Sequence, residues 1–164
     1  MTAPPRESHA RVRGLVALYR QTRYEVTLPD ANVATLRVGE PVPPAVTRWI
    51  GAARFAVYLT ACNPYSASLT VAHNQSRFVR LCERLCALGA RWLEGIASSA
   101  EKTWSEPSVL VSGVPTAVCD ALAFEFEQNA SVGVDASGRA RLRVYRHDWR
   151  AALDAAPDID WIER

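Results

Sequence analysis

Long apolar runs, lysine and cysteine are all scarce in this chain of 164 residues. No stretch approaches the roughly 18 consecutive apolar residues that suggest a membrane span. The first residues, MTAPPRESHARVR, carry Pro, Glu and Arg where a secretory signal needs an apolar core. We therefore expect a soluble, cytoplasmic protein that makes no contact with a membrane.

The four cysteines, Cys62, Cys82, Cys86 and Cys119, are too few and too scattered to predict a disulfide framework. We expect them to be reduced and packed in the interior. Cys82 and Cys86 are one helical turn apart, but no second ligand pair at zinc spacing accompanies them, so no metal site is predicted. The glycine-rich phosphate loops of nucleotide-binding and dinucleotide-binding proteins are also absent, and the cofactor stays unknown.

The charge balance gives little support for nucleic-acid binding. The formal net charge is +2, and Lys102 is the single lysine among 19 basic residues. Together with abundant alanine and valine, this skew is typical of a GC-rich genome rather than of selection for phosphate contacts. With 49% hydrophobic and 22% charged residues, the chain fits one globular domain. We expect that domain to span residues 10–164, after a flexible tail of residues 1–9.

The pattern of apolar residues predicts helices that alternate with strands. The last two strands flank the turn 135–138 as a hairpin, and a short helix and an extended end follow. The fold class is therefore α/β or α+β, a single layered domain whose mixed central sheet is flanked by helices and carries a C-terminal β-hairpin. Predicted helices cover residues 10–21, 46–50, 71–88 and 115–126, and predicted strands cover 24–29, 33–38, 55–61, 92–96, 108–112, 130–134 and 140–146.

The predicted strand 55–61 marks the first candidate site. Its apolar character is nearly continuous, which indicates burial on both faces in the middle of a sheet. It ends at Thr60, and Asn63 and Ser66 follow within a few residues. Because ligands gather beyond the carboxyl ends of central strands in open α/β sheets, we predict that Thr60, Asn63 and Ser66 bind a ligand. Ordinary turn chemistry around Asn63 and Pro64 is the alternative.

The long predicted helix 71–88 adds two candidates. Asn74 lies on the same stripe as Leu81 and Leu85, so a polar amide points toward the core. A buried amide without partners costs about 1 to 3 kcal/mol, and the loop after Asn63 is the nearest source of them. Arg77 lies at the flank of that stripe. We predict that Asn63, Asn74 and Arg77 converge on one polar pocket; a loop-fixing role for Asn74 and a solvated Arg77 are the alternatives.

A second polar cluster, Trp104 to Ser108, precedes the apolar run that begins at Val109. Glu106 is the candidate proton acceptor, and hence the catalytic candidate, and Ser108 is a candidate ligand-binding residue. A structural ion pair, with Arg77 for instance, is the alternative for Glu106. Gln128 is a weaker candidate at the end of the third long helix. A nucleophilic Cys62 with His73 as its base is the least favoured chemistry, because nothing in the sequence brings their side chains together.

Several segments, TACNPYS (60–66), NQSR (74–77), Gly95, WSEPSVLVSG (104–113) and FEQNA (126–130), resemble an uncharacterised bacterial family, domain of unknown function 3293. The likeness covers about residues 24–144. The family commonly has an aromatic residue where Cys62 stands, which argues against an essential Cys62 nucleophile. The family has no established reaction, so the resemblance supports the choice of site residues and leaves the function open. The positions that match its pattern are Thr60, Asn63, Pro64, Asn74, Arg77, Trp104, Glu106, Ser108, Gln128 and Ala130.

The last predicted strand offers a competing interpretation. Arg139, Arg141, Arg143 and Tyr145 alternate onto one strand face, a pattern that suits RNA or single-stranded DNA. A solvated face on an edge strand is the simpler explanation, since charges there discourage aggregation.

Two hypotheses about function follow from these residues. In the first, the domain binds a small polar molecule, an anionic or nucleotide-like metabolite held by Arg77, with Glu106 available for catalysis. In the second, it is a noncatalytic interaction module that contacts a protein partner through surface residues such as Trp149, Arg150 and Trp161.

Overall fold

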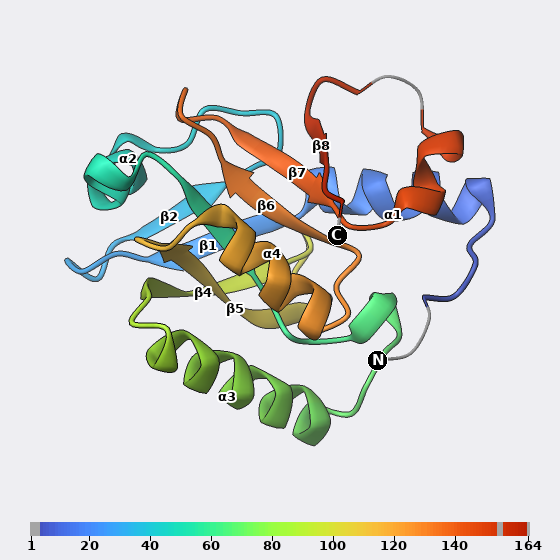
Figure 1. Cartoon of the computed structure of the whole chain (residues 1–164), viewed down its shortest axis with the longest axis horizontal. Coiled ribbons are helices and arrows are strands. Elements are labelled where there is room, and N and C mark those ends of the chain that lie inside the picture. The colour runs from blue at the N-terminus through green and yellow to red at the C-terminus, as the bar shows by residue number, and fades with distance from the viewer. Residues whose placement is uncertain (1–3, 154–155, 164) are drawn as a thin grey trace.

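The computed structural model describes residues 4–153 and 156–163, in which one eight-stranded sheet has helices on both faces (Figure 1). Its strands follow the order β2-β1-β4-β5-β3-β6-β7-β8, and neighbouring strands are antiparallel except for the parallel pair β7 and β8. This arrangement confirms the predicted layered fold with a mixed sheet. The strands are β1 (Arg23–Thr27), β2 (Val33–Leu36), β3 (Ala56–Leu59), β4 (Arg91–Ser98), β5 (Ser105–Ser112), β6 (Ala130–Val134), β7 (Ala140–Val144) and β8 (Ile159–Trp161).

The helices divide between the two faces of the sheet. One face, which we call the α1 face, is covered by α1, α2 and η3, and the opposite α3 face is covered by α3 and α4 (Figure 1). Each face has its own apolar cluster, so the sheet has a core on both sides. No helix of the described residues has the length and apolar character to cross a membrane. The helical segments are α1 (His9–Gln21), α2 (Pro44–Ile50), η1 (Gly51–Ala53), η2 (Pro64–Ser66), α3 (Val71–Ala87), α4 (Thr116–Glu125) and η3 (His147–Ala152).

Local signals explain where the long helices begin and end. The side chain of Thr70 accepts a hydrogen bond from the backbone of His73 and caps α3, and Gly89 follows the helix with φ +61°. Pro44 occupies the first turn of α2, where its missing N–H costs nothing. The division into a tail of residues 1–9 and a domain of residues 10–164 stays a prediction.

Strand β3 is central, as its apolar sequence predicted. All four of its residues are buried, and it lies between β5 and β6. Successive side chains enter opposite cores: Tyr58 packs in the α1 face and Leu59 in the α3 face. Both neighbours of β3 are antiparallel, so the rule for open α/β sheets does not locate the site in this fold.

Gly95 on β4 allows a close approach of two strands at the edge of the α1 face. A Cβ atom at this position would lie 2.5 Å from the carbonyl oxygen of Glu25 and 2.8 Å from the hydroxyl of Tyr58. That hydroxyl donates a hydrogen bond of 3.0 Å to the same Glu25 carbonyl. A glycine is therefore required for Tyr58 to lie across β4.

Three expectations about surface and core are wrong. Trp149 was expected on the surface but is fully buried, because η3 packs against α1 and inserts the indole into the α1 face. Cys86 is exposed and Cys82 half-buried, since they lie toward the solvent side of α3. Strand β7 is not an edge strand, because β8 adds to it in parallel.

Candidate functional site

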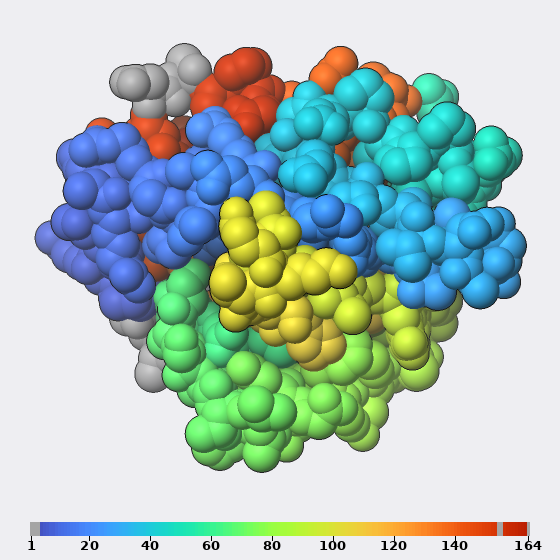
Figure 2. Space-filling model, turned by 180° about the vertical axis from the view of Figure 1, so that it is seen from behind, coloured from blue at the N-terminus to red at the C-terminus, as the bar shows by residue number. Residues whose placement is uncertain are grey.

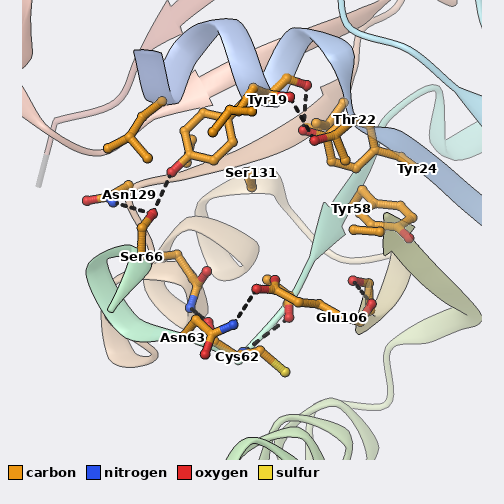
Figure 3. A pocket seen from close by; sticks show the side chains of 18 of the residues that line it. Tyr19, Thr22, Tyr24, Tyr58, Cys62, Asn63, Ser66, Glu106, Asn129 and Ser131 are labelled. Atoms are coloured by element: carbon orange, nitrogen blue, oxygen red, sulfur yellow. Dashed lines mark hydrogen bonds between the residues drawn. The ribbon is translucent and has the colours of Figure 1, made fainter. Parts of the chain in front are cut away.

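A cavity of about 440 Å³ opens at the end of β3, between α1 and the α1 face of the sheet (Figure 3). Figure 2 shows the turn that joins β4 and β5, in yellow, between α1 in blue and the loop after β3 in green. Five of the predicted site residues line this cavity: Thr60, Asn63, Ser66, Glu106 and Ser108. Its volume is in the range of small-molecule sites.

The cavity exists because β5 extends beyond its neighbour β3. Strand β3 ends at Leu59, opposite Val109, while β5 begins four residues earlier at Ser105. Pro107 lies in the part of β5 that pairs with β4 but extends beyond β3. Its missing N–H therefore costs no hydrogen bond to β3. The hydroxyl of Thr60 donates to the Pro107 carbonyl at 3.0 Å and accepts from the backbone of Cys62 at 3.1 Å. Thr60 therefore turns the chain away from the sheet and opens the space.

The loop after β3 has an uncommon backbone conformation. Asn63, Tyr65 and Ser66 all have positive φ, at 46°, 50° and 60°. Residues of this kind cost of order 1 to 3 kcal/mol each when they are not glycine, and such strain is concentrated at functional sites. The N–H of Tyr65 donates to the carbonyl of Glu127 at 2.7 Å, which helps to hold the loop against the end of α4. With this backbone conformation, the side chains of Asn63 and Ser66 lie in the cavity wall (Figure 3).

Asn63 is the centre of the hydrogen bonds around this loop. Its Nδ2 donates to Glu106 Oε1 at 2.6 Å, and its Oδ1 accepts from the backbone N–H of Leu69 and from Asn74 Nδ2, both at 2.9 Å. The Oδ1 of Asn74 in turn accepts from the Asn63 N–H at 2.9 Å. The predicted meeting of Asn63 and Asn74 is therefore confirmed, and both amides fix the loop.

Arg77 holds the same loop from the other side. Its Nε donates to the carbonyl of Ala61 and its Nη2 to that of Phe126, both at 2.6 Å, and its guanidinium lies 5.7 Å from the centre of the Phe126 ring. Among the described residues that line the cavity, neither Arg77 nor Asn74 appears. Their contacts are with the protein itself, so direct ligand binding by these two residues stays a prediction without structural support.

Glu106 is half-buried and forms no ion pair with Arg77. Burial raises the pKa of its carboxyl, and the hydrogen bond from Asn63 opposes that rise. Oε1 accepts the Asn63 bond, whereas no residue that the structure describes donates to Oε2. The arrangement leaves one carboxylate oxygen, of raised proton affinity, available to a molecule in the cavity.

Ser66 connects the cavity to a buried arginine. Its hydroxyl lies 3.0 Å from the hydroxyl of Tyr19 and accepts from Asn129 Nδ2 at 3.0 Å. Asn129 Oδ1 accepts from Arg146 Nη1 at 2.9 Å, and Asp148 accepts from the same guanidinium. These bonds fix the Tyr19 side of the wall.

Sequence reasoning missed the aromatic part of the wall. Tyr19, Tyr24 and Tyr58 line the cavity, and burial raises the pKa of each, so all three remain protonated at neutral pH. Ser108 is fully buried, and its hydroxyl donates to the backbone carbonyl of Glu106 at 3.2 Å. The available signal was alternation, which places Tyr24 with Val26 and Tyr58 with Ala56 on one strand face. Gln128, a weaker candidate, also lines the cavity.

Three other interpretations of the sequence are a nucleophilic Cys62, a basic strip on β7 and a metal site. Burial raises the pKa of the Cys62 thiol, which donates to the backbone carbonyl of Asn74, and His73 is an exposed residue on α3, so the structure gives the Cys62–His73 pair no support. On β7, Arg141 pairs with Asp160 and Arg143 with Asp120, while Tyr145 is buried in the α3 face. Two of the three arginines in the predicted basic strip are therefore paired with carboxylates of the protein itself. No cluster of metal-ligating side chains occurs in the part of the chain that the structure describes.

The raised pKa of Glu106 predicts a pH-dependent gain in stability for Glu106→Gln. The folded protein holds this proton more tightly than the unfolded chain, so the stability that the protonated carboxyl contributes is lost as pH rises from about 4.3 through the folded pKa. We expect the variant to match the wild type near pH 4 and to have the higher free energy of unfolding at neutral pH. Urea unfolding at a series of pH values measures the difference.

Glu94→Gln is the matched control for that experiment. Glu94 is an exposed carboxylate on β4, outside the cavity, and its replacement is expected to change the free energy of unfolding by less than about 0.5 kcal/mol. A Glu106→Gln variant that is less stable than the wild type at neutral pH would contradict the assignment of Glu106 as a carboxylate whose burial is unfavourable.

Comparison with known families agrees with the resemblance inferred from the motifs. Residues 59–131 match the family described as Protein of unknown function (DUF3293), so the resemblance is shown over the middle of the chain. The matched segment begins at the last residue of β3 and contains the loop, α3, Glu106 and α4. No curated protein and no solved structure matches the chain.

Proposed function

We propose that this protein binds a small polar molecule in the cavity beside β3, with Glu106 as its principal hydrogen-bond acceptor. The observation that carries the proposal is the Asn63–Glu106 pair. Asn63 is held in a strained conformation by three other hydrogen bonds and directs its amide at one oxygen of a half-buried carboxylate, and the second oxygen is left for a ligand. A network with only a structural role would not require a carboxylate oxygen, Oε2 of Glu106, that accepts no hydrogen bond from the described residues.

Glu106 is also the residue through which the protein would exchange a proton with the bound molecule. Its raised pKa lies closer to neutrality than that of an exposed glutamate, which is the property that general acids and bases require. The alternative, an interaction module, loses support because Trp149 is buried and Trp161 is half-buried with Arg150 over its ring at 5.3 Å.

A thermal-shift screen of the purified protein tests the proposal. The panel consists of nucleotides, sugar phosphates, amino acids, polyols and amines. A ligand present at about 100 times its Kd stabilises the native state by about 2.7 kcal/mol, which raises Tm by about 5 to 10 °C for a chain of this size. A panel in which no compound raises Tm would overturn the proposal.

A variant that fills the cavity links any ligand to this site. Ser105 is exposed at the cavity wall, and Ser105→Trp is expected to abolish the shift in Tm. Ala100→Trp places the same side chain at an exposed position of the neighbouring turn, outside the lining, and is expected to retain it. Binding that survives Ser105→Trp would mean that the ligand occupies another part of the protein.

A further inference from the structure

The charge of the cavity wall restricts the chemistry of the ligand. Among the described residues, the wall contains one carboxylate, Glu106, and no arginine, lysine or histidine. Arg77 and Arg146, which hold the loop and the Tyr19 side of the wall, are outside the lining, and each is already engaged: Arg77 by two backbone carbonyls, and Arg146 by Asp148 and Asn129. A phosphate or carboxylate in this cavity would meet Glu106 without a compensating cation, which is strongly unfavourable in a partly buried site.

Several hydrogen-bond donors in the wall are also engaged within the protein. Gln128 donates its amide group to two backbone carbonyls at 3.0 Å, and the hydroxyls of Tyr24 and Tyr58 each donate to a backbone carbonyl, at 2.8 and 3.0 Å. Asn63 directs one N–H to Glu106 itself. These donors are engaged within the protein, whereas Oε2 of Glu106 accepts no bond from the described residues, so the site matches a ligand that brings donors of its own.

Aromatic rings supply much of the remaining wall. Tyr19, Tyr24 and Tyr58 line it, and Figure 3 shows these three around the space that Glu106 enters. Tyr24 and Tyr58 meet edge to face, with ring centres 5.3 Å apart. Trp104 and Leu18 lie at the opening, 38% and 52% exposed. Aromatic rings together with one carboxylate form the surface that recognises organic ammonium groups in proteins.

We infer that the ligand of this cavity is a small organic cation, an alkylammonium or methylated ammonium compound whose positive group contacts Glu106. Its carbon skeleton packs among the tyrosine rings and Trp104. This inference rests on the proposed function and specifies the class of ligand. It departs from the anionic metabolite expected from the sequence, because Arg77 donates to the loop instead of the cavity.

The test compares cations with uncharged molecules of the same shape. Choline, tetramethylammonium, butylamine and putrescine are titrated by thermal shift and calorimetry, and choline is paired with the alcohol in which a tert-butyl group replaces its trimethylammonium group. We expect at least one cation to bind and the uncharged isostere to bind at least tenfold more weakly. Glu106→Gln is expected to weaken the cation by about 30-fold or more. Trp104→Ala is expected to weaken it by about two- to fivefold.

The controls separate this inference from the proposed function. Glu94→Gln removes one negative charge outside the cavity and is expected to leave cation affinity unchanged, which excludes a general charge effect. If no cation binds but a polyol or an anion does, and Ser105→Trp blocks it, the inference is wrong and the proposed function stands. If the cation and its isostere bind equally, the role of Glu106 as a charge partner is also refuted.

Discussion

Replacing Arg77 by alanine is expected to lower the free energy of unfolding by about 2 to 4 kcal/mol. Arg77 joins the carbonyls of Ala61 and Phe126, which lie 65 residues apart in the sequence, and hydrogen bonds from a charged donor contribute about 1.5 to 3 kcal/mol each. The variant leaves two carbonyls without these donors and releases the strained loop from the end of α4. Urea denaturation measures the loss, and hydrogen exchange is expected to show faster exchange at residues 61–67.

Arg80→Ala is the matched control for that variant. The guanidinium of Arg80 also lies 5.7 Å from the centre of the Phe126 ring, yet Arg80 is exposed and donates no hydrogen bond to the residues that the structure describes. Its replacement is expected to cost less than about 0.5 kcal/mol. If Arg77→Ala were as stable as Arg80→Ala and failed only to bind a ligand, Arg77 would be a binding residue instead of a loop anchor.

Replacing Asp120 by alanine is expected to cost about 3 to 5 kcal/mol. Asp120 on α4 accepts from Arg143 Nε at 3.1 Å, from Arg143 Nη2 at 2.7 Å and from the hydroxyl of Tyr145 at 2.9 Å. The paired side chains are only 12% and 15% exposed, so the variant buries an uncompensated guanidinium. Thermal and urea unfolding give the size of the loss.

The pair between Arg141 and Asp160 provides the comparison on the same strand. These side chains are 25% and 33% exposed, and Asp160→Ala is expected to cost no more than about 1 kcal/mol because solvent screens the remaining charge. Equal losses at Asp120 and Asp160 would show that burial does not set the strength of these pairs.

Local patterns predicted the elements of this fold with good boundaries. The glycine after α3, Gly89, and the proline at the start of α2 act over a few residues, so they are visible in the sequence. The burial of β3 and the inward amide of Asn74 followed from periodicity alone. The full lengths of β4 and β5 could not be predicted in this way. Their outer residues pair with each other beyond the run of apolar residues that marks a strand in the sequence.

The position of the candidate site side chains was harder to predict, since it depends on which distant residues meet. The sequence placed Arg77 beside the pocket, but a side chain with five donors can turn to any nearby carbonyl, and Arg77 turned to the loop. Trp149 shows the same limit: nothing local distinguishes a surface tryptophan from one that η3 inserts into a core.

By itself, the sequence determined the layered α/β architecture, the central strand and the loop at which polar residues gather, because periodicity and capping are encoded over short distances. Only the tertiary structure decided which side chains that loop presents to the cavity. Glu106 meets Asn63 across 43 residues, and Tyr19 meets Ser66 across 47. Contacts of that range depend on the complete packing of sheet and helices, and they gave the cavity an acidic, aromatic wall instead of a cationic one.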